Sequence, residues 1–421
     1  MECNRRSSFR NCRVPPSSNV LLRLLSCLAL GLFVLATAAC SGRPVALGNE
    51  AYIWQRQWTP ALGDAVRTSS DVVQGWRVLA AELDGRGQWH LVEPDAAVLL
   101  ATGKPVTVVV RIEGQLAQWD AADVIDHIQS VLAQWRGRGL RIAGVEIDHD
   151  CATSRLPVYA RFLSLLRTSL GEPLRLSITV LPTWLDSASL DALLARVDES
   201  VLQVHAVQSP RAGLFDPRQA HAWMDAFARH ARGPWRVALP AYGTRVSWDG
   251  QGRVASIESE RPTLVAGDEA SELFADPLAM QGFVSALEAD APQRLAGIVW
   301  FRVPTEDDAR AWSLATWRAV LSRQPLVVSL LAQVRSAPDI ALRDLVLINA
   351  GNADLPLPSL LRLDATCGNA DGIHGYALQR TPHGLFLQRA QRGVLRAGRQ
   401  LSVGWLRCDG GAALRVESSE P

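Results

Sequence analysis

The segment Gly144-Val145-Glu146-Ile147-Asp148-His149-Asp150-Cys151 carries the strongest structural signal in this chain. It continues an apolar run from Leu140 and predicts a strand whose C-terminal end is acidic. Because side chains alternate along a strand, Glu146, Asp148 and Asp150 are expected on one face. Three neighbouring carboxylates repel one another, so the row indicates a role in chemistry or cation binding rather than in folding.

The sequence around this strand alternates apolar and amphipathic segments from residue 51 to 323. Eight strand-like runs occur, at 51–55, 72–79, 105–112, 141–148, 174–181, 201–207, 235–240 and 296–303. Helix-like stretches lie between them, such as 121–136, where apolar residues recur at i, i+3 and i+4. The pattern predicts an α/β fold, a (β/α)8 TIM-type barrel, with an open doubly wound sheet as the alternative.

The rest of the chain, from residue 324 to 421, has a different pattern. Short alternating runs are separated by clusters of Gly, Asn, Asp and Pro, which predicts a small antiparallel, sandwich-like β domain. The 421 residues are 48% hydrophobic and 20% charged, with a formal net charge of +1. This composition suits a globular core, and the charge balance gives no reason to expect a nucleic-acid partner.

The N-terminal segment resembles an export signal. Five arginines precede the apolar run from Leu24 to Ala39, which is too short to span a membrane comfortably. Small residues then precede Cys40, as in the lipobox of bacterial lipoproteins. The resemblance implies a signal peptide at 1–39, lipid attachment to Cys40 and a lipidated tether at 40–50. An ordinary signal peptide or an uncleaved anchor is the alternative.

Export would also set the compartment and the state of the cysteines. The lipoprotein resemblance implies a bacterial cell-envelope location, and Ser41 favours the outer membrane, facing the periplasm or the surface. Cys367 and Cys408 both lie in the predicted C-terminal domain and are candidates for a disulfide in an oxidising compartment. Cys151 is expected to be a buried small hydrophobe and not a nucleophile.

The active site of a β/α barrel lies where the strands end. Applied to the predicted strands, this rule selects, besides the acids, the following polar and aromatic side chains: Trp54, Arg111, Gln203, His205, Tyr242, Trp300 and Arg302. Acids beside aromatic rings suit a carbohydrate, because rings stack on sugars and paired carboxylates move protons at a glycosidic bond. No histidine pair has metal-binding spacing and no phosphate-binding loop occurs, so we expect no metal and no cofactor.

Some of these residues also have a structural interpretation. Glu146 lies one pleat deeper than the other acids and could form a buried ion pair with Arg77 or Arg111. Trp300 could be a large core side chain. Arg302 could hold an anionic sugar or only a nearby acid.

The acidic segment resembles the strand-four signature of glycoside hydrolase family 18, the chitinase-like barrels. That signature reads Asp-Gly-x-Asp-x-Asp-x-Glu. Gly144, Glu146, Asp148 and Asp150 fall on its Gly, its second Asp, its third Asp and its final Glu, while Ala143 stands at the first Asp.

Two later segments extend the resemblance. Pro240-Ala241-Tyr242-Gly243 resembles strand seven of that superfamily. Gly297-Ile298-Val299-Trp300 resembles its strand eight, which ends in a Trp at the floor of the sugar site. The span from Tyr52 to Pro304 also resembles a family of bacterial lipoproteins of unknown function, numbered 3142.

The resemblance implies hydrolysis of a polysaccharide or peptidoglycan-type glycan. Asp150 would donate the proton, Asp148 would stabilise positive charge, and Glu146 would be a further catalytic acid. The family's proton donor is a Glu; the Asp carboxyl is set back by about 1.5 Å, which can cost about a hundredfold in rate. The alternative is a non-catalytic glycan-binding or structural envelope lipoprotein on the same barrel. The expected partners are a carbohydrate and, through the lipid anchor, a membrane.

Overall fold

The computed structural model of the chain describes residues 46–421 apart from 117, 172, 206–213, 252–253, 259–268, 309, 337–341, 366–368, 391–392, 408–411 and 417–421. Residues Ala46–Pro421 form one compact unit. The predicted signal peptide, Cys40 and the pair Cys367 and Cys408 lie outside the described residues and stay predictions. Within the described part, no helix combines the length and apolarity needed to cross a membrane.

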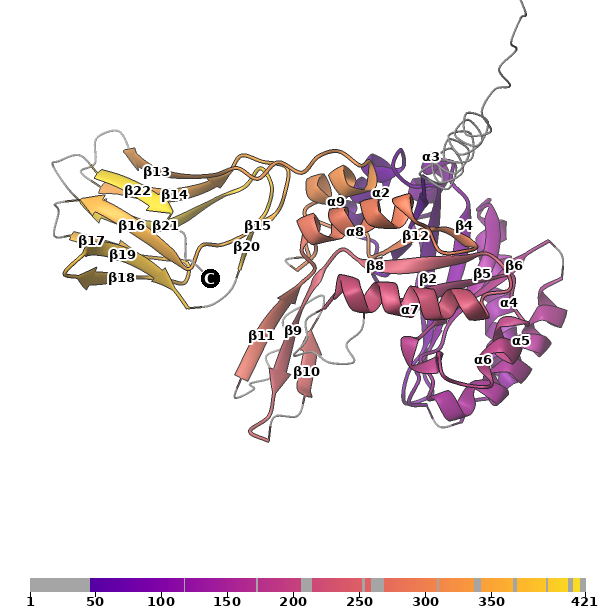
Figure 1. Cartoon of the computed structure of the whole chain (residues 1–421). Coiled ribbons are helices and arrows are strands. Elements are labelled where there is room, and N and C mark those ends of the chain that lie inside the picture. Colours follow the sequence, from indigo (N-terminus) through magenta and orange to yellow (C-terminus); the bar gives the residue numbers. More distant parts are fainter. Residues whose placement is uncertain are drawn as a thin grey trace, which may run out of the picture. The chain divides into compact units, whose positions relative to one another are not determined.

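Eight parallel strands form a closed barrel (Figure 1). In barrel order they are β1 (Gly48–Ile53), β2 (Gly75–Leu83), β4 (Val106–Ile112), β5 (Ile142–Asp148), β6 (Arg175–Val180), β7 (Glu199–Gln203), β8 (Trp235–Pro240) and β12 (Leu295–Phe301). The ring closes because β1 pairs with both β12 and β2. The predicted barrel is confirmed, and the doubly wound alternative is wrong, since such a sheet has two open edges.

Helices follow the barrel strands and pack on their outer faces. They are α2 (Pro60–Ser69), α3 (Ala96–Thr102), α4 (Ala121–Gly137), α5 (Leu156–Leu170), α6 (Leu190–Leu194), α7 (Pro217–His230), α8 (Pro277–Ala289) and α9 (Leu314–Leu321). In α4 the Asp120 carboxylate caps the first turn by accepting from the Ala122 amide at 2.8 Å. Its buried side chains, which include Val124, Ile128 and Leu132, recur at helical spacing and form the face turned to the barrel.

Strand side chains alternate between the barrel interior and the layer beneath the helices. On β5, Val145 and Ile147 join the apolar cluster shared with the helices, whereas Glu146 bonds to strands across the interior. On β2 the alternation is interrupted between Leu79 and Ala81, where the register with β4 shifts. The predicted limits 72–79 differ from the observed ones, because the strand begins at Gly75 and continues through this bulge to Leu83.

Shorter antiparallel strands decorate the barrel. β3 (Trp89–Leu91) pairs with the end of β2. After β8, the strands β9 (Gly243–Trp248), β10 (Val254–Glu258) and β11 (Glu269–Phe274) form a three-stranded sheet with β9 in the centre.

The C-terminal region consists of antiparallel sheets. One contains β13 (Leu330–Ser336), β14 (Leu342–Asn349), β21 (Gln400–Arg407) and β17 (Asn369–Gly372). The other contains β18 (Tyr376–Thr381), β19 (Gly384–Arg389), β16 (Leu360–Ala365) and β22 (Ala412–Val416), and a short pair joins β15 (Leu355–Pro356) to β20 (Val394–Leu395). Both larger sheets contribute leucines to one apolar cluster, so the predicted antiparallel β fold is confirmed.

Candidate functional site

The lower part of the barrel interior, toward the N-terminal ends of the strands, holds a network of ion pairs. Arg77 pairs with Glu50 (2.7 Å), Glu146 and Glu199, while Arg236 pairs with Glu50 (3.0 Å) and Glu199 (3.1 Å). We call these five residues the lower ion network. Each of its carboxylates contacts a guanidinium, which is the condition under which charges are tolerated inside a barrel.

Glu146 therefore belongs to the lower ion network in the barrel interior, and its predicted part as a further catalytic acid stays a prediction. Its Oε1 accepts a hydrogen bond from the Tyr52 hydroxyl at 2.6 Å. Its Oε2 accepts from Arg77 and from the Ser177 hydroxyl at 3.1 Å. Burial raises the pKa of Glu146 and Arg77 opposes that rise. Both oxygens are thus occupied by the fold, as the ion-pair interpretation implied.

Asp148 is positioned by hydrogen bonds from three neighbouring strands. Its Oδ1 accepts from the Thr179 hydroxyl at 2.7 Å and lies 3.4 Å from the donating Gln203 amide nitrogen. Its Oδ2 accepts from Arg111 at 3.2 Å. The side chain is buried, so donors on both oxygens hold the carboxylate in one orientation at the C-terminal end of β5.

Asp150 lies two residues further on and has different surroundings. Its Oδ1 is buried and has no hydrogen-bond partner. Burial raises the pKa of Asp150 to about 7, the Asp148 and Glu113 carboxylates add to the rise, and Arg111 opposes it. Gly114 admits the segment, because a Cβ there would lie 2.0 Å from the Asp150 carbonyl oxygen. A carboxyl group of this kind exchanges its proton near neutral pH, as a general acid must.

Aromatic rings fill the interior at this end of the barrel. The Phe301 ring centroid lies 5.7 Å from that of Tyr52, 5.1 Å from Trp54 and 5.5 Å from Tyr242. The His205 ring stacks on Phe301 at 5.4 Å. We call these five residues the aromatic floor. Trp54, His205 and Tyr242, which the sequence selected separately, are brought together there, and such rings suit a sugar face.

Gln203 and His205 project from neighbouring positions on one face of the β7 segment. Gln203 contacts Asp148, as described above. The Nε2 atom of His205 is buried without a hydrogen-bond partner, and burial lowers its pKa to about 4. The imidazole is therefore neutral at neutral pH, and one of its ring nitrogens is buried without a partner. An unsatisfied buried polar atom costs about 1–3 kcal/mol, so a bound hydroxyl or water would be stabilised there.

Trp300 lies on the other side of the sheet, which corrects the prediction that it forms the floor of a sugar site. Its side chain is fully buried in the layer beneath the helices, 6.1 Å from the Trp312 ring. Its indole nitrogen donates to the Asn49 side chain at 3.0 Å. Strand alternation then turns the next residue, Phe301, into the barrel, and Phe301 supplies the floor ring.

Arg111 is engaged by the protein's own acids, while 26% of its side chain stays exposed, so its contact with a substrate stays a prediction. Its guanidinium lies 3.2 Å from Asp148 and 3.7 Å from both Glu82 and Glu113. It also lies over the Trp54 ring, 5.9 Å from the centroid. Arg111 therefore joins the acids to the aromatic floor.

Arg302 is likewise held by an acid, which is one of the two alternatives considered for it. Its side chain is 1% exposed and pairs with Asp308. Its guanidinium carbon lies 5.6 Å from the centroid of the Tyr242 ring. Arg302 therefore supports the Tyr242 ring from below, and its predicted contact with an anionic sugar has no support in this arrangement.

The structure adds participants that the sequence did not select: Tyr52, Glu82, Thr179, Phe301 and Asp308. Alternation from Trp54 would have placed Tyr52 on the same face, so that residue had a usable signal. Glu82 had none, because the bulge in β2 resets the alternation. Asp308 lies outside any strand, and its partner is known only from the fold.

The two other unusual residues of the acidic segment pack outside the barrel. Cys151 is buried as expected, and burial raises the pKa of its thiol to about 11, which disfavours the reactive thiolate at neutral pH. His149 is buried with its Nδ1 3.0 Å from the Ile112 carbonyl oxygen. Neither contributes to the site.

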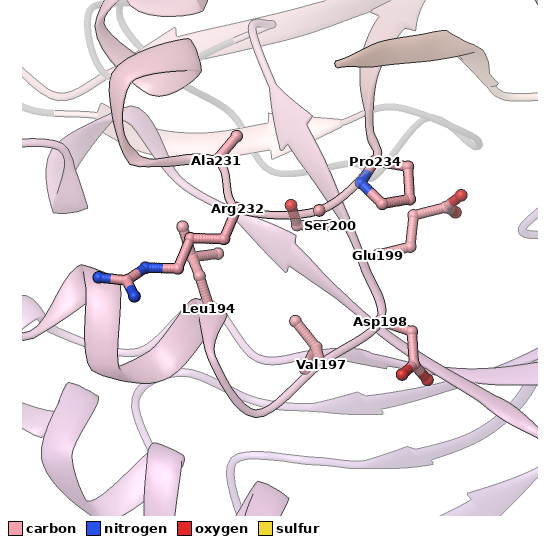
Figure 2. Close-up of a pocket in the computed structure, with 9 residues that line it drawn as sticks. Leu194, Val197, Asp198, Glu199, Ser200, Ala231, Arg232 and Pro234 are labelled. Carbon is pink, nitrogen blue, oxygen red and sulfur yellow. The ribbon is translucent and has the colours of Figure 1, made fainter. Parts of the chain in front are cut away.

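A small hollow lies at the opposite end of the barrel, where β7 and β8 begin. It encloses about 200 Å³ of space that is partly open to solvent (Figure 2). In Figure 2 the side chains of Arg232 and Asp198 point to different sides of it. Asp198 pairs with Arg167 and Glu199 belongs to the lower ion network, so these charges serve the fold. Among the described residues, no group of His, Cys, Asp and Glu is arranged to hold a metal ion.

Comparison with known proteins finds the family numbered 3142 that the sequence resembles, whereas the lipoprotein character stays a prediction. Residues 102–306 match a domain of unknown function, DUF3142, and residues 332–409 match a second one, DUF8456. No curated protein matches the chain.

Solved structures that are similar to this chain include a spore cortex-lytic enzyme and chitinases. The spore cortex-lytic enzyme SleL of Bacillus cereus is 18% identical, with 67% of this chain and 75% of that one covered and a TM-score of 0.48. A chitinase from Chromobacterium violaceum is 14% identical, with 66% and 99% covered and a TM-score of 0.47. A family 18 chitinase from Cycas revoluta, in complex with (GlcNAc)4, is 14% identical, with 66% and 99% covered and a TM-score of 0.43.

Proposed function

We propose that this DUF3142-containing chain binds a glycan at the C-terminal end of its barrel and hydrolyses it, with Asp150 as the proton donor. The observation that carries the proposal is the state of Asp150. The side chain is half-buried, its Oδ1 atom is buried without a hydrogen-bond partner, and its pKa is raised to about 7 by burial and by the neighbouring Asp148 carboxylate. These are the properties of an acid that protonates a leaving-group oxygen near neutral pH.

Asp148 has the complementary role. Its two oxygens accept hydrogen bonds from Thr179, Gln203 and Arg111, which hold the carboxylate in place. A fixed negative charge stabilises the positive charge that develops on the sugar ring as the glycosidic bond breaks. After burial, the Asp148 charge is the next cause that raises the pKa of Asp150. Asp150 can then act as the proton donor while Asp148 stays ionised as its electrostatic partner.

The aromatic floor supplies the surface for the sugar. Phe301 is partly exposed and offers an apolar ring for stacking, while the buried rings of Trp54 and Tyr242 pack against it and hold it in place. Arg111 and Arg302 do not face a ligand as free cations, so the site suits a neutral sugar better than one recognised through an anionic group.

A second candidate is glycan binding without turnover. The side chain at position 150 is one methylene shorter than the glutamate of the chitinase-like signature. An acid set back by about 1.5 Å can lose about a hundredfold in rate, enough to leave a binding protein on the same barrel. The aromatic floor would serve this function equally well.

Wild type and Asp150→Asn, produced from Gly42 onward, distinguish the two candidates. Each is screened for binding and hydrolysis with chitooligosaccharides, peptidoglycan fragments and bacterial exopolysaccharides, and Asp64→Asn is the control because that acid lies on the exposed face of α2. Hydrolysis by wild type and the control, lost in Asp150→Asn with binding retained, supports the enzyme. Equal binding without turnover in all three supports the binding protein, and no binding by any of them contradicts both.

The proposed location is the bacterial cell envelope, through a lipid on Cys40. Support comes from the sequence alone: a basic segment, a short apolar run and small residues before the cysteine. Expression of the full chain and of Cys40→Ser in a Gram-negative host tests it, with fatty-acid labelling and membrane fractionation as readouts. Unlabelled wild-type protein would contradict lipid attachment.

A further inference from the structure

The connection between β12 and α9, residues 302–308 and 310–313, is organised around Asp308. The carboxylate of Asp308 pairs with Arg302 through one oxygen. Its other oxygen, Oδ1, accepts hydrogen bonds from the backbone amides of Arg310 (3.0 Å) and Ala311 (3.2 Å). One buried acid thus fixes both the guanidinium beneath Tyr242 and the path of the chain beyond it.

This connection also fixes the backbone on both sides of Tyr242. The Gly243 amide donates to the Arg310 carbonyl oxygen at 2.6 Å, and the Trp312 amide donates to the Ala241 carbonyl oxygen at 3.0 Å. Tyr242 itself forms a β-bridge with Ala311. The backbone that carries the Tyr242 ring is therefore bonded to this connection at three successive positions.

The C-terminal β region is hydrogen-bonded to the same connection. The Arg396 guanidinium, just after β20, donates to the carbonyl oxygens of Asp308, Ala311 (3.1 Å) and Glu306 (3.3 Å). These three carbonyls lie on both sides of the Asp308 turn. One planar group with several donors can satisfy them together, which an ammonium or an apolar side chain cannot do with the same geometry.

Asp354, just before β15, makes a second attachment. Its Oδ2 accepts from the Ser313 amide at 2.6 Å, where α9 begins, and its Oδ1 accepts from the Ala397 amide at 2.8 Å. The carboxylate is 4% exposed, so these charge-assisted bonds are shielded from water. Asp354 thus ties the β15–β20 pair to the end of the connection, while Arg396 ties it to the middle.

We propose that Arg396 and Asp354 of the C-terminal β region are positioning residues for the glycan site, acting through the β12–α9 connection on Arg302 and Tyr242. The C-terminal region is then part of the site's support and not a separate binding module. The effect on glycans rests on the proposed function, but the effect on the connection does not. Positioning matters because a displacement of about 1 Å in a site costs about a hundredfold in rate.

The test compares Arg396→Ala with Arg399→Ala in the full chain. Arg399 is the matched control: it also contacts the connection, pairing with Glu306 at 2.8 Å, but its side chain is 60% exposed. Such exposed pairs contribute little. Arg396→Lys and Asp354→Asn are included so that the test stands even if Arg396→Ala does not fold.

Hydrogen exchange is the first readout, since it needs no substrate. We expect amides of residues 241–243 and 310–313 to exchange at least tenfold faster in Arg396→Ala and in Asp354→Asn, with protection in β4 and β5 unchanged, and no change in Arg399→Ala. Arg396→Lys should restore part of the protection. Unchanged exchange in the folded Arg396 and Asp354 variants would overturn the proposal.

Glycan binding and turnover are the second readout. We expect Arg396→Ala to raise the KM or Kd for a bound oligosaccharide about tenfold, while the pH at which Asp150 loses its proton stays the same, because Asp148 lies on β5 and Asp150 just after it, away from the connection. An altered pH profile with unchanged KM would contradict positioning through Tyr242. If wild type binds no glycan, the proposed function fails, and the exchange result still decides the positioning claim.

Discussion

Glu146 and Asp150 share one face of the β5 segment, yet the two ends of the barrel interior treat them differently. In the lower ion network every carboxylate contacts Arg77 or Arg236. At the upper end, Asp150 keeps an oxygen without a partner and a pKa raised to about 7. The difference shows that two acids on one face of a strand segment can have different surroundings, one held by the cations of the fold and the other with an oxygen left unbonded.

The largest effect on activity is expected from removal of the Asp150 carboxyl group. Asp150→Asn is expected to lower kcat by about a hundredfold to ten-thousandfold, the range for loss of a general acid, with little change in glycan binding. Initial rates and binding isotherms on the oligosaccharide found in the screen measure both. Activity within threefold of wild type would move the proton donor to another residue.

Removing the lower guanidinium should affect stability instead. Arg77→Met leaves Glu146 and Glu199 buried with fewer positive partners, which is expected to cost about 3–5 kcal/mol in the free energy of unfolding. Denaturant unfolding measures it, and Arg67→Met, from an exposed ion pair on α2, should change stability by about 0.5 kcal/mol or less. Equal effects of the two variants would mean that the lower ion network adds no more than a surface pair.

The pH dependence of stability gives a third comparison. The folded-state pKa of Asp150 is raised from 3.8 to about 7, so its contribution to stability is fully present below about pH 4 and is lost as the pH rises through 7. Asp150→Asn should therefore stabilise the protein relative to wild type above pH 7, by roughly 2 kcal/mol after allowance for partial exposure, and less at pH 4. Unfolding curves at several pH values provide the check; a difference independent of pH contradicts the raised pKa.

The smallest effect is expected from changes on β12, where Phe301 faces the barrel interior and Trp300 faces the helices. Phe301→Leu should weaken glycan binding about threefold to tenfold, because the floor loses a ring while keeping apolar volume. Trp300→Phe should leave binding unchanged and cost about 1–3 kcal/mol in stability, since Trp300 fills the outer layer and bonds to Asn49. The reverse pattern would restore the prediction made from the resemblance.

Much of the site was accessible from the sequence because strand alternation is local. It placed Asp148 and Asp150 together, and the strand-end rule found Trp54, Gln203 and Tyr242 on other strands. The prediction that Trp300 lies at the floor of the site was wrong. Adjacent residues on one strand point to opposite faces, and a match to a motif does not determine which of the two enters the barrel.

The partners of charged side chains could not be predicted from strand alternation. Arg111 and Arg302 have the chemistry of ligand-binding residues, and only the fold shows that Asp148 and Asp308 already occupy them. Arg396 gave no signal at all, since its three acceptors are backbone carbonyls about ninety positions earlier in the chain.

The sequence by itself determined the β/α barrel, the antiparallel C-terminal β fold and the acidic end of β5, because hydrophobic period and turn residues act over a few positions. Only the tertiary structure decided which acid is paired and which is free. Ion pairing, burial and the resulting pKa depend on groups brought together from distant strands, as with Arg77 and Glu146 below and the unpartnered Asp150 above.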